Sequence, residues 1–282
     1  MLIARITRGL ATTVGSMALI AIIVIMMIPV VVIVVMSFAA DRIVIFPPRH
    51  WGLDQYTSFV ESDYWVAALR QSFEISLPSA ALALVIGVPA VFAMRNTRNF
   101  PLPGLFQAIG ASPLVIPSVA YALAVYVFYL DVHLTGTIIG VILIDSALAL
   151  PFVLLIVGSV YDRIPRELEL VAMSLGASPT RAVVGITLRL MLPGIGAAFI
   201  FGFIAAFDDA VFINFVGGPT LETLPKAIYD SLQTSMAPLI NAVATILMVG
   251  TGVILSLASY WRYTLSKRSS EASDKLRVPA NG

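Results

Sequence analysis

The chain is 282 residues long, with 59% hydrophobic residues, only 12% charged residues and a formal net charge of +1. A water-soluble domain carries about 25% charged residues, so this composition excludes a soluble globular protein and indicates a surface that faces lipid. The chain has no cysteine, which excludes disulfides and thiolate metal sites. Two isolated histidines, His50 and His133, are too few for a histidine-based metal site.

The N-terminal segment carries Arg5 and Arg8 and continues as an apolar run through Met36. That run is longer than the roughly 7–15 apolar residues of a signal peptide, and no small-residue cleavage site interrupts it. We therefore expect a retained first membrane span.

Six apolar segments are each long enough to provide the about 20 residues that a helix needs to cross the hydrocarbon. Because lipid offers the backbone no hydrogen-bond partners, these segments must be helices. They lie at about residues 12–37, 73–94, 104–129, 137–160, 192–213 and 239–261. The sequence thus predicts an all-α membrane protein with six transmembrane helices in a single domain, 1–282.

The distribution of charge predicts the orientation. Thirteen of the seventeen Lys and Arg residues lie in the N-terminus, the loops at 95–103 and 161–191 and the C-terminal tail. Segments rich in Lys and Arg stay in the cytoplasm, so both termini, the 161–191 loop and the polar tail at 263–282 are predicted to be cytoplasmic. The other side holds ten acids against four bases, and an acidic surface concentrates cations.

The 161–191 loop has the pattern of two short helices joined by a tight turn. Pro165 suits a first helical position, and Glu167 and Glu169 suit a first turn. Gly176 is expected to be a left-handed cap, after which Ser178–Pro179 begins a second helix. Residues of the first helix share one apolar face: Leu168, Val171, Ala172 and Leu175. This element either lies on its own bundle and lipid or docks into a groove on a partner.

Residues 167–195 resemble the EAA loop of ABC importer permeases, the MetI-like inner-membrane components of binding-protein-dependent transport. The glycine–alanine turn and its spacing to Pro193–Gly194 are the specific part of the resemblance. Two positions depart from it, because Leu170 stands where the family usually has glutamate and Arg189 where it usually has proline. In that family the loop seats in the ATPase, which implies these coupling residues: Glu169, Ala172, Leu175, Gly176, Ala177 and Ser178.

More weakly, Trp51–Tyr56 resembles the Trp-x-Leu-x-x-Tyr segment that follows the first span in the same family. The segments Ala206–Pro219 and Thr223–Tyr229 are similar to PotC-type permeases of spermidine/putrescine importers. The resemblance implies a type I ABC importer permease fold and a small polar, cationic solute. Candidate residues of the substrate path are Asp145, Asp208, Asp209 and Asn214. Acids within a span are costly and face the bundle interior or water. Alternatively, the adjacent aspartates cap a helix–loop junction, and Asp145 forms an interhelical hydrogen bond.

The resemblance also implies the partners: an ABC ATPase dimer, a second permease subunit such as a PotB-like paralogue, and a periplasmic or lipid-anchored binding protein, all at the bacterial inner membrane. ATP and Mg would be bound by the ATPase, so no cofactor, enzymatic activity or nucleic-acid partner is expected in this chain. Consistently, the sequence has no Gly-x-x-x-x-Gly-Lys-Ser/Thr loop. Related permeases carry other solutes, including opine-like amines and phosphonates, and these stay open as alternatives.

Two other classes of membrane protein compete with this interpretation. An ion-coupled secondary transporter often has helices broken near mid-membrane, and Pro113, Pro117 and Pro151 could break helices. However, we find no inverted repeat, and the 161–191 loop would have no explanation. An intramembrane enzyme would need a nucleophile–base pair or metal ligands within the bundle, and no predicted span contains a histidine.

Overall fold

The computed structural model describes residues 2–41, 45–96, 103–234 and 238–256, and within them the regular secondary structure is helical. The helices group into two compact units, Met1–Asp63 with Ser231–Val249 and Tyr64–Asp230 with Gly250–Gly282. In the described part of the chain five helices are long and apolar enough to cross a membrane, and a bent helix pair makes a sixth. The predicted all-α architecture with six membrane spans is confirmed.

The first unit contains α1 (Leu2–Ser37), α2 (Asp54–Glu61) and the first part of the helix Leu239–Ser256. The membrane-length part of α1, Gly15–Ser37, ends at the same residue as the predicted first span. Only 6% of its most apolar window is buried within the structure. Its side chains are therefore available to lipid.

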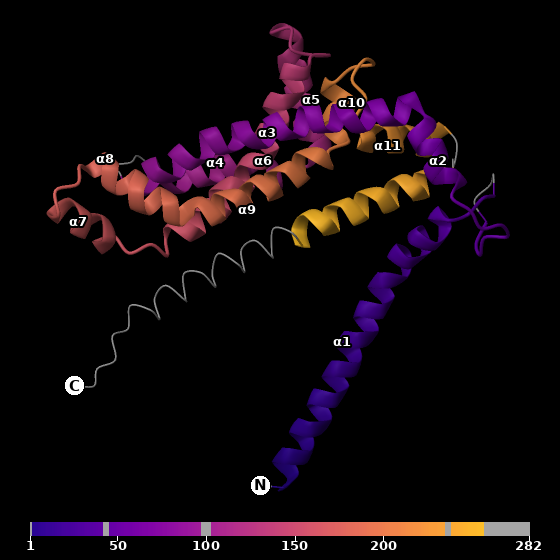
Figure 1. Ribbon diagram of the computed structural model, residues 1–282, viewed down its shortest axis with the longest axis horizontal. Helices are drawn as coiled ribbons and strands as arrows, with labels where there is room; N and C mark the ends of the chain where they lie inside the picture. Colours follow the sequence, from indigo (N-terminus) through magenta and orange to yellow (C-terminus); the bar gives the residue numbers. More distant parts are fainter. Residues whose placement is uncertain (1, 42–44, 97–102, 235–237, 257–282) are drawn as a thin grey trace. The chain divides into compact units, whose positions relative to one another are not determined.

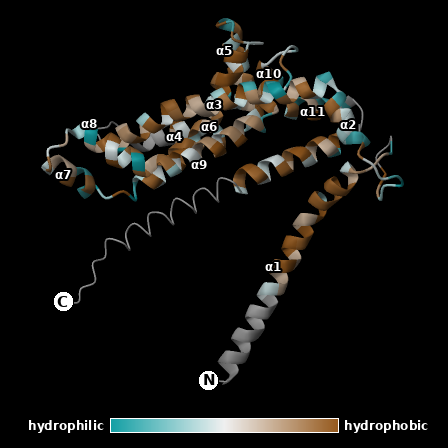
Figure 2. Ribbon diagram, in the orientation of Figure 1, coloured by the Kyte–Doolittle hydropathy of each residue, from teal (hydrophilic) through white to brown (hydrophobic). Residues whose placement is uncertain are grey.

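The second unit is built around three long helices, α3 (Asp63–Asn96), α6 (Ile138–Tyr161) and α9 (Leu188–Phe207), which run side by side (Figure 1). Their shared core consists of small and β-branched residues with one methionine: Ala83, Val91, Ala149, Val153, Val157, Met191 and Ala198. Small side chains allow close packing of helices where lipid supplies no hydrophobic driving force. Hydrophobic residues cover much of α1, α6 and α9 (Figure 2).

Shorter elements lie at the two ends of this unit. At one end are α7 (Glu167–Ser174) and α8 (Pro179–Ala182), and α8 continues through the π-helical turn η1 (Val183–Thr187) into α9. At the opposite end are α5 (Ser118–Asp131), α10 (Val211–Val216) and α11 (Leu224–Thr234) (Figure 1). The two regions of predicted function therefore lie at opposite ends of one helix bundle.

Two predicted spans, the second and the fifth, have different limits in the structure. The second begins at Asp63 rather than 73, whereas the fourth, predicted at 137–160, agrees with α6 to within one residue. The fifth is a continuous helix, Pro179–Phe207, so it starts before 192 and ends before 213. The sixth is described from Leu239 to Ser256, and the rest of that span and the polar tail at 263–282 lie outside the described residues.

The third predicted span is a bent pair rather than one helix. Its first half is α4 (Pro103–Val115), its second half is α5, and the two halves meet at an angle of 113°. Proline lacks an amide hydrogen, and it disfavours helical backbone in the residue before it. Pro117 therefore ends the first helix at this point, whereas Pro113 and Pro151 remain inside helices.

A close helix approach gives a first test of this packing. A Cβ atom at Gly194 would meet Val160 Cγ2 at 2.7 Å, where α9 crosses α6, whereas a Cβ atom at Gly252 would meet nothing within 4 Å. We expect Gly194→Ala to destabilise the protein by about 1–3 kcal/mol through overpacking. The same change at Gly252 should be neutral or stabilise by up to about 1 kcal/mol.

The measurement is thermal unfolding in detergent followed by the fluorescence of the three tryptophans. A lower midpoint for Gly194→Ala than for Gly252→Ala is the expected result. Equal midpoints for the two variants would contradict the close approach of α9 to α6.

Candidate functional site

The 161–191 loop forms the predicted pair of short helices. Gly176 has φ +94°, the left-handed conformation expected of a glycine cap. The Ser178 hydroxyl accepts a hydrogen bond from the Arg181 amide at 3.3 Å, and Pro179 is the first residue of α8. The cap and the turn are thus confirmed, whereas α7 begins at Glu167 rather than at Pro165 and ends at Ser174.

Helix α7 presents an open apolar face. The exposed fractions of its large apolar side chains range from 41% at Leu168 to 60% at Leu170, and Leu175 directly after it is 84% exposed. Of the predicted apolar face, Ala172 is instead partly buried, and Glu169 one turn earlier is partly buried as well. The helix therefore turns Glu169 and Ala172 inward and its leucine-rich face outward.

Glu169 is held within the protein. Its Oε1 accepts a hydrogen bond from the Thr187 hydroxyl, and Thr187 is completely buried at the end of η1. Leu170, at the position where the family usually has glutamate, lies on the exposed face. Sequence reasoning places Glu169 in the loop, but the contact with Thr187 carries no sequence signal because it joins residues on separate elements.

The start of the same loop is fixed to α3. Asp162, directly after α6, forms an ion pair with Arg95 near the end of α3. One turn away, the rings of Phe92 and Tyr161 pack edge to face with centroids 5.2 Å apart. These contacts join α3, α6 and the loop at one end of the second unit.

At the opposite end, α9 stops at Phe207, so the two adjacent aspartates lie beyond the helix rather than in its last turns. Asp208 is exposed, whereas Asp209 is partly buried. The Asp209 carboxylate accepts hydrogen bonds from the amides of the first turn of α10: Val211 at 3.3 Å, Phe212 at 3.3 Å and Ile213 at 3.1 Å. Of the two interpretations left open by the sequence, capping is the role observed for Asp209.

Asn214 is turned towards its own helix. Its side-chain amide donates to the Ala210 carbonyl at 2.6 Å, one turn earlier. This geometry uses one of the two N–H donors of the amide locally, so the second N–H and the side-chain oxygen leave Asn214 a candidate for the substrate path.

Asp145, in the middle of α6, is the least satisfied acid of the described structure. Its side chain is 2% exposed, and its Oδ1 has no hydrogen-bond partner among the described residues. Asp209 lies within electrostatic range of Asp145 and also of Asp208. The three acids near the break between α9 and α10 are called here the acid cluster.

A buried lysine holds the loop that follows α10. The ammonium group of Lys226 donates to the carbonyls of Gly218 at 3.0 Å and Leu221 at 2.8 Å, and pairs with Glu222 at 3.2 Å. Glu222 also accepts a hydrogen bond of 2.7 Å from the Tyr64 hydroxyl on α3. The sequence analysis missed this network, although a glutamate four residues before a lysine on a helix is a recognisable pair.

A pocket of about 340 Å³ opens beside this network, in the second unit. Its polar lining comes from α3 and from the loop: Tyr64, Arg70, Gln71, Glu74, Thr220 and Glu222. Arg70 already pairs with Glu74 at 2.7 Å, and Glu222 is paired with Lys226, so the charges of this pocket are balanced internally.

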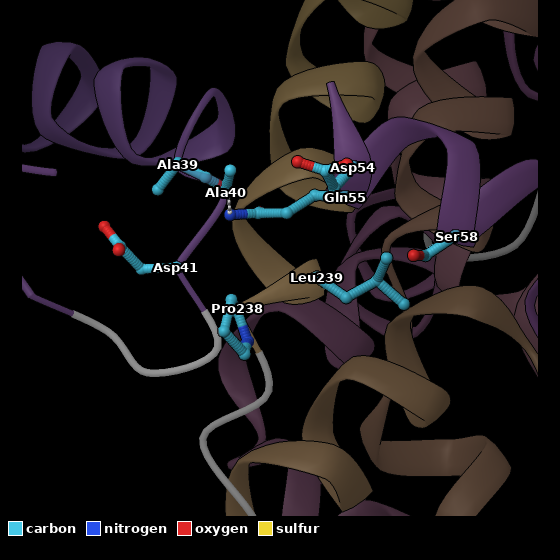
Figure 3. Close-up of a pocket in the computed structure, with 8 residues that line it drawn as sticks. All are labelled: Ala39, Ala40, Asp41, Asp54, Gln55, Ser58, Pro238 and Leu239. Carbon is cyan, nitrogen blue, oxygen red and sulfur yellow. Dashed lines mark hydrogen bonds between the residues drawn. The ribbon is translucent and has the colours of Figure 1, made fainter. Parts of the chain in front are cut away.

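The first unit has its own pocket, of about 600 Å³, between the end of α1, α2 and the start of the helix at Leu239 (Figure 3). Gln55 reaches across it from α2 and donates to the carbonyls of Met36 at 3.1 Å and Ala39 at 2.6 Å. Asp41 at its edge accepts hydrogen bonds from the His50 ring and the Arg49 amide, which hold the pKa of its carboxyl below the ordinary value. Asp41 is therefore ionised at neutral pH, and the Gln55 contacts fix α2 against the end of α1.

A helical bundle of membrane length that carries a helical loop with an open apolar face is the architecture of a permease subunit that works with a separate partner. The chain belongs to the family of binding-protein-dependent transport system inner membrane components, whose family model matches residues 2–269. It is therefore a multi-pass inner-membrane permease subunit of an ABC importer, and the ATPase is a separate chain. Family membership replaces the secondary-transporter and intramembrane-enzyme alternatives.

Among its relatives are two polyamine permeases of Escherichia coli K12. The putrescine transport system permease PotI is 26% identical over 216 residues, which cover 74% of this chain and 77% of the relative. The spermidine/putrescine permease PotC is 28% identical over 211 residues, covering 72% and 76%. The sulfoquinovosyl glycerol permease SmoH of Agrobacterium fabrum C58 is 27% identical over 190 residues, covering 66% of each chain.

Solved structures share the fold. A chain of a bacterial ABC transporter involved in import of the acidic polysaccharide alginate matches with a TM-score of 0.64 at 14% identity, over 90% of this chain and 96% of that chain. A chain of a bacterial alginate ABC transporter in complex with an alginate pentasaccharide-bound periplasmic protein matches with a TM-score of 0.65 at 17% identity, over 90% of this chain and 95% of that chain. The predicted permease fold is thus confirmed.

The capping role of Asp209 can be tested through stability. Asp209→Ala removes the acceptor for three amides of α10 and should destabilise the protein by about 0.5–2 kcal/mol. Asp209→Asn keeps a side-chain oxygen at the same place, so its loss of unfolding free energy should be much smaller. Tryptophan-monitored unfolding measures both, and a smaller loss for the alanine variant than for the asparagine variant would contradict capping.

Proposed function

We propose that this permease subunit forms half of the translocation path for a small cationic solute, a polyamine such as putrescine or spermidine. The observation that carries the proposal is the acid cluster of Asp145, Asp208 and Asp209, in which one buried carboxylate oxygen has no partner. The names of the relatives PotI and PotC support the same solute class.

The chemistry of the cluster suits an ammonium group. A buried carboxylate without a hydrogen bond is costly, and an arriving cation that donates to it offsets that cost. Asp208 is exposed and can meet a cation first, whereas Asp145 is buried within α6. Asp209, held by the α10 amides, adds negative charge without having to move.

An anionic or neutral solute is the alternative, and the relative SmoH gives it some support. Negative charge at this break repels an anionic solute, and a neutral one gains nothing from it. Opine-like amines carry a cationic nitrogen and remain compatible with the cluster. Phosphonates are anionic, so the cluster disfavours them.

The open apolar face of α7 is the proposed docking surface for the ATPase. Exposed leucines on a short helix outside the membrane match helix-in-groove recognition. In this proposal both termini and the 161–191 loop are cytoplasmic, and an ATPase dimer binds ATP and Mg. A PotB-like second permease subunit completes the path, and a periplasmic or lipid-anchored binding protein delivers the solute at the opposite side.

Uptake by the reconstituted importer tests the acid cluster. Asp145→Asn keeps the shape of the side chain and removes its charge, so we expect the KM for putrescine to rise about tenfold or more, equivalent to about 1.4 kcal/mol. Asp131→Asn, at an exposed acid at the end of α5, is the matched control and should leave KM unchanged. Wild-type KM in Asp145→Asn, or faster uptake of a neutral sugar than of putrescine, would contradict the cationic solute.

The turn at Gly176 tests the coupling role. A β-branched side chain is strained at φ +94°, so Gly176→Val should distort the turn between α7 and α8. We expect membrane insertion and expression to be retained and ATP-driven uptake to be lost. Gly250→Ala, outside the loop and with nothing within 4 Å of the added carbon, is the control and should transport normally. Normal uptake in Gly176→Val would rule out this turn as a coupling element.

A further inference from the structure

Helix α7 meets the rest of the second unit through α8 and η1. Of its eight residues only Glu169 and Ala172 are partly buried, and the others are exposed. Ala172 has only a methyl group to offer. Glu169 is therefore the inward side chain that can make a directional contact.

The partner of Glu169 lies at an unusual place in the chain. Thr187 is completely buried and is the last residue of the π-helical turn, where the Leu188 amide bonds the Val183 carbonyl five residues earlier. A π-helical turn within an α-helix is rare and is found mostly at functional sites. Beyond it the same helix continues without a break to Phe207.

The place of position 169 on α7 explains why this acid faces inward. Neighbouring residues on an α-helix differ in direction by about 100°. The next residue, Leu170, lies on the exposed side of α7 and is 60% exposed. At position 169 the carboxylate instead reaches the Thr187 hydroxyl.

From this geometry we infer that Glu169 is a positioning residue that braces α7 on Thr187, so that force applied to α7 is transmitted to α9. The inference rests on the proposed docking of α7 to the ATPase and adds the internal path of coupling. The charge of Glu169 is not required for contact with the ATPase. What is required is an acceptor oxygen at position 169 and a hydroxyl at position 187.

The test uses the complete importer, with both permease subunits, the ATPase and the binding protein, reconstituted in nanodiscs. The readout is the stimulation of ATP hydrolysis by the liganded binding protein, divided by the basal rate of the same complex. Glu169→Gln and Thr187→Ser keep the hydrogen bond and should retain stimulation to within about twofold. Glu169→Ala and Thr187→Val remove it, and each should lower stimulation about tenfold without changing the basal rate.

The double variant Glu169→Ala/Thr187→Val decides whether the two residues act as one unit. If they brace each other, the double variant is no worse than either single variant, because the contact can be lost only once. Two results would overturn the inference: multiplicative losses in the double variant, or an equal loss in Glu169→Gln and Glu169→Ala with Thr187→Val unaffected. The second result would assign Glu169 to a charged contact with the ATPase. Glu169 is only partly buried in a loop, so its variants remain informative even where a Thr187 variant expresses poorly.

A separate variant distinguishes failure of the brace from failure of the docking proposal. Leu175, directly after α7, is 84% exposed, whereas Glu169 is partly buried. Leu175→Asp should prevent the ATPase from co-purifying with the permease. If the complex assembles and is stimulated normally in Leu175→Asp, the docking proposal fails, whatever the Glu169 variants show.

Discussion

The structure depends on one uninterrupted helix, Pro179–Phe207, which joins the 161–191 loop to the acid cluster. Its 29 residues correspond to about 44 Å at 1.5 Å per residue, enough to cross a bilayer. Within lipid the backbone of such a helix cannot give up its hydrogen bonds, so the helix resists breaking there. Whatever moves one end must therefore move the other, or must act at the π-helical turn or at the stop beyond Phe207.

The irregular parts of the second unit are placed at the two ends of that helix and are nearly all satisfied internally. At one end Gly176, Ser178 and Thr187 complete the backbone and side-chain hydrogen bonds of the loop. At the other end Asp209 accepts hydrogen bonds from amides at the start of α10, and Lys226 donates to carbonyls of the turn that follows α10. Asp145 departs from this pattern, which is the physical reason for giving it a ligand rather than a structural role.

Much of this architecture could be predicted from the sequence, because its cause is local. Long apolar runs predict the spans, and the glycine and Ser-Pro signals predict the turn between α7 and α8, since each depends on a few consecutive residues. Contacts between distant residues could not be predicted in the same way. The fifth span predicted from hydropathy includes residues 208–213, because Asp209 is followed by apolar residues. The structure shows that they form a separate capped helix.

The direction of individual side chains was also beyond the sequence. Periodicity places Ala172 on the apolar face of α7, yet that face divides once α8 and η1 pack against one side of the helix. Glu169 was identified from its resemblance to a coupling acid, and only the fold shows that it points towards Thr187. The bend at Pro117 could be predicted only in part. Proline marks a possible break in a helix, but Pro113 and Pro151 stay within helices.

The exposed face of α7 is the proposed surface on which the ATPase acts. A photocrosslinking amino acid in place of Leu175 tests it directly, with the same substitution at exposed Leu155 of α6 as the comparison. We predict a covalent product between the permease and the ATPase from position 175 and none from position 155. Crosslinking to lipid alone from both positions, in an importer that still transports, would contradict it.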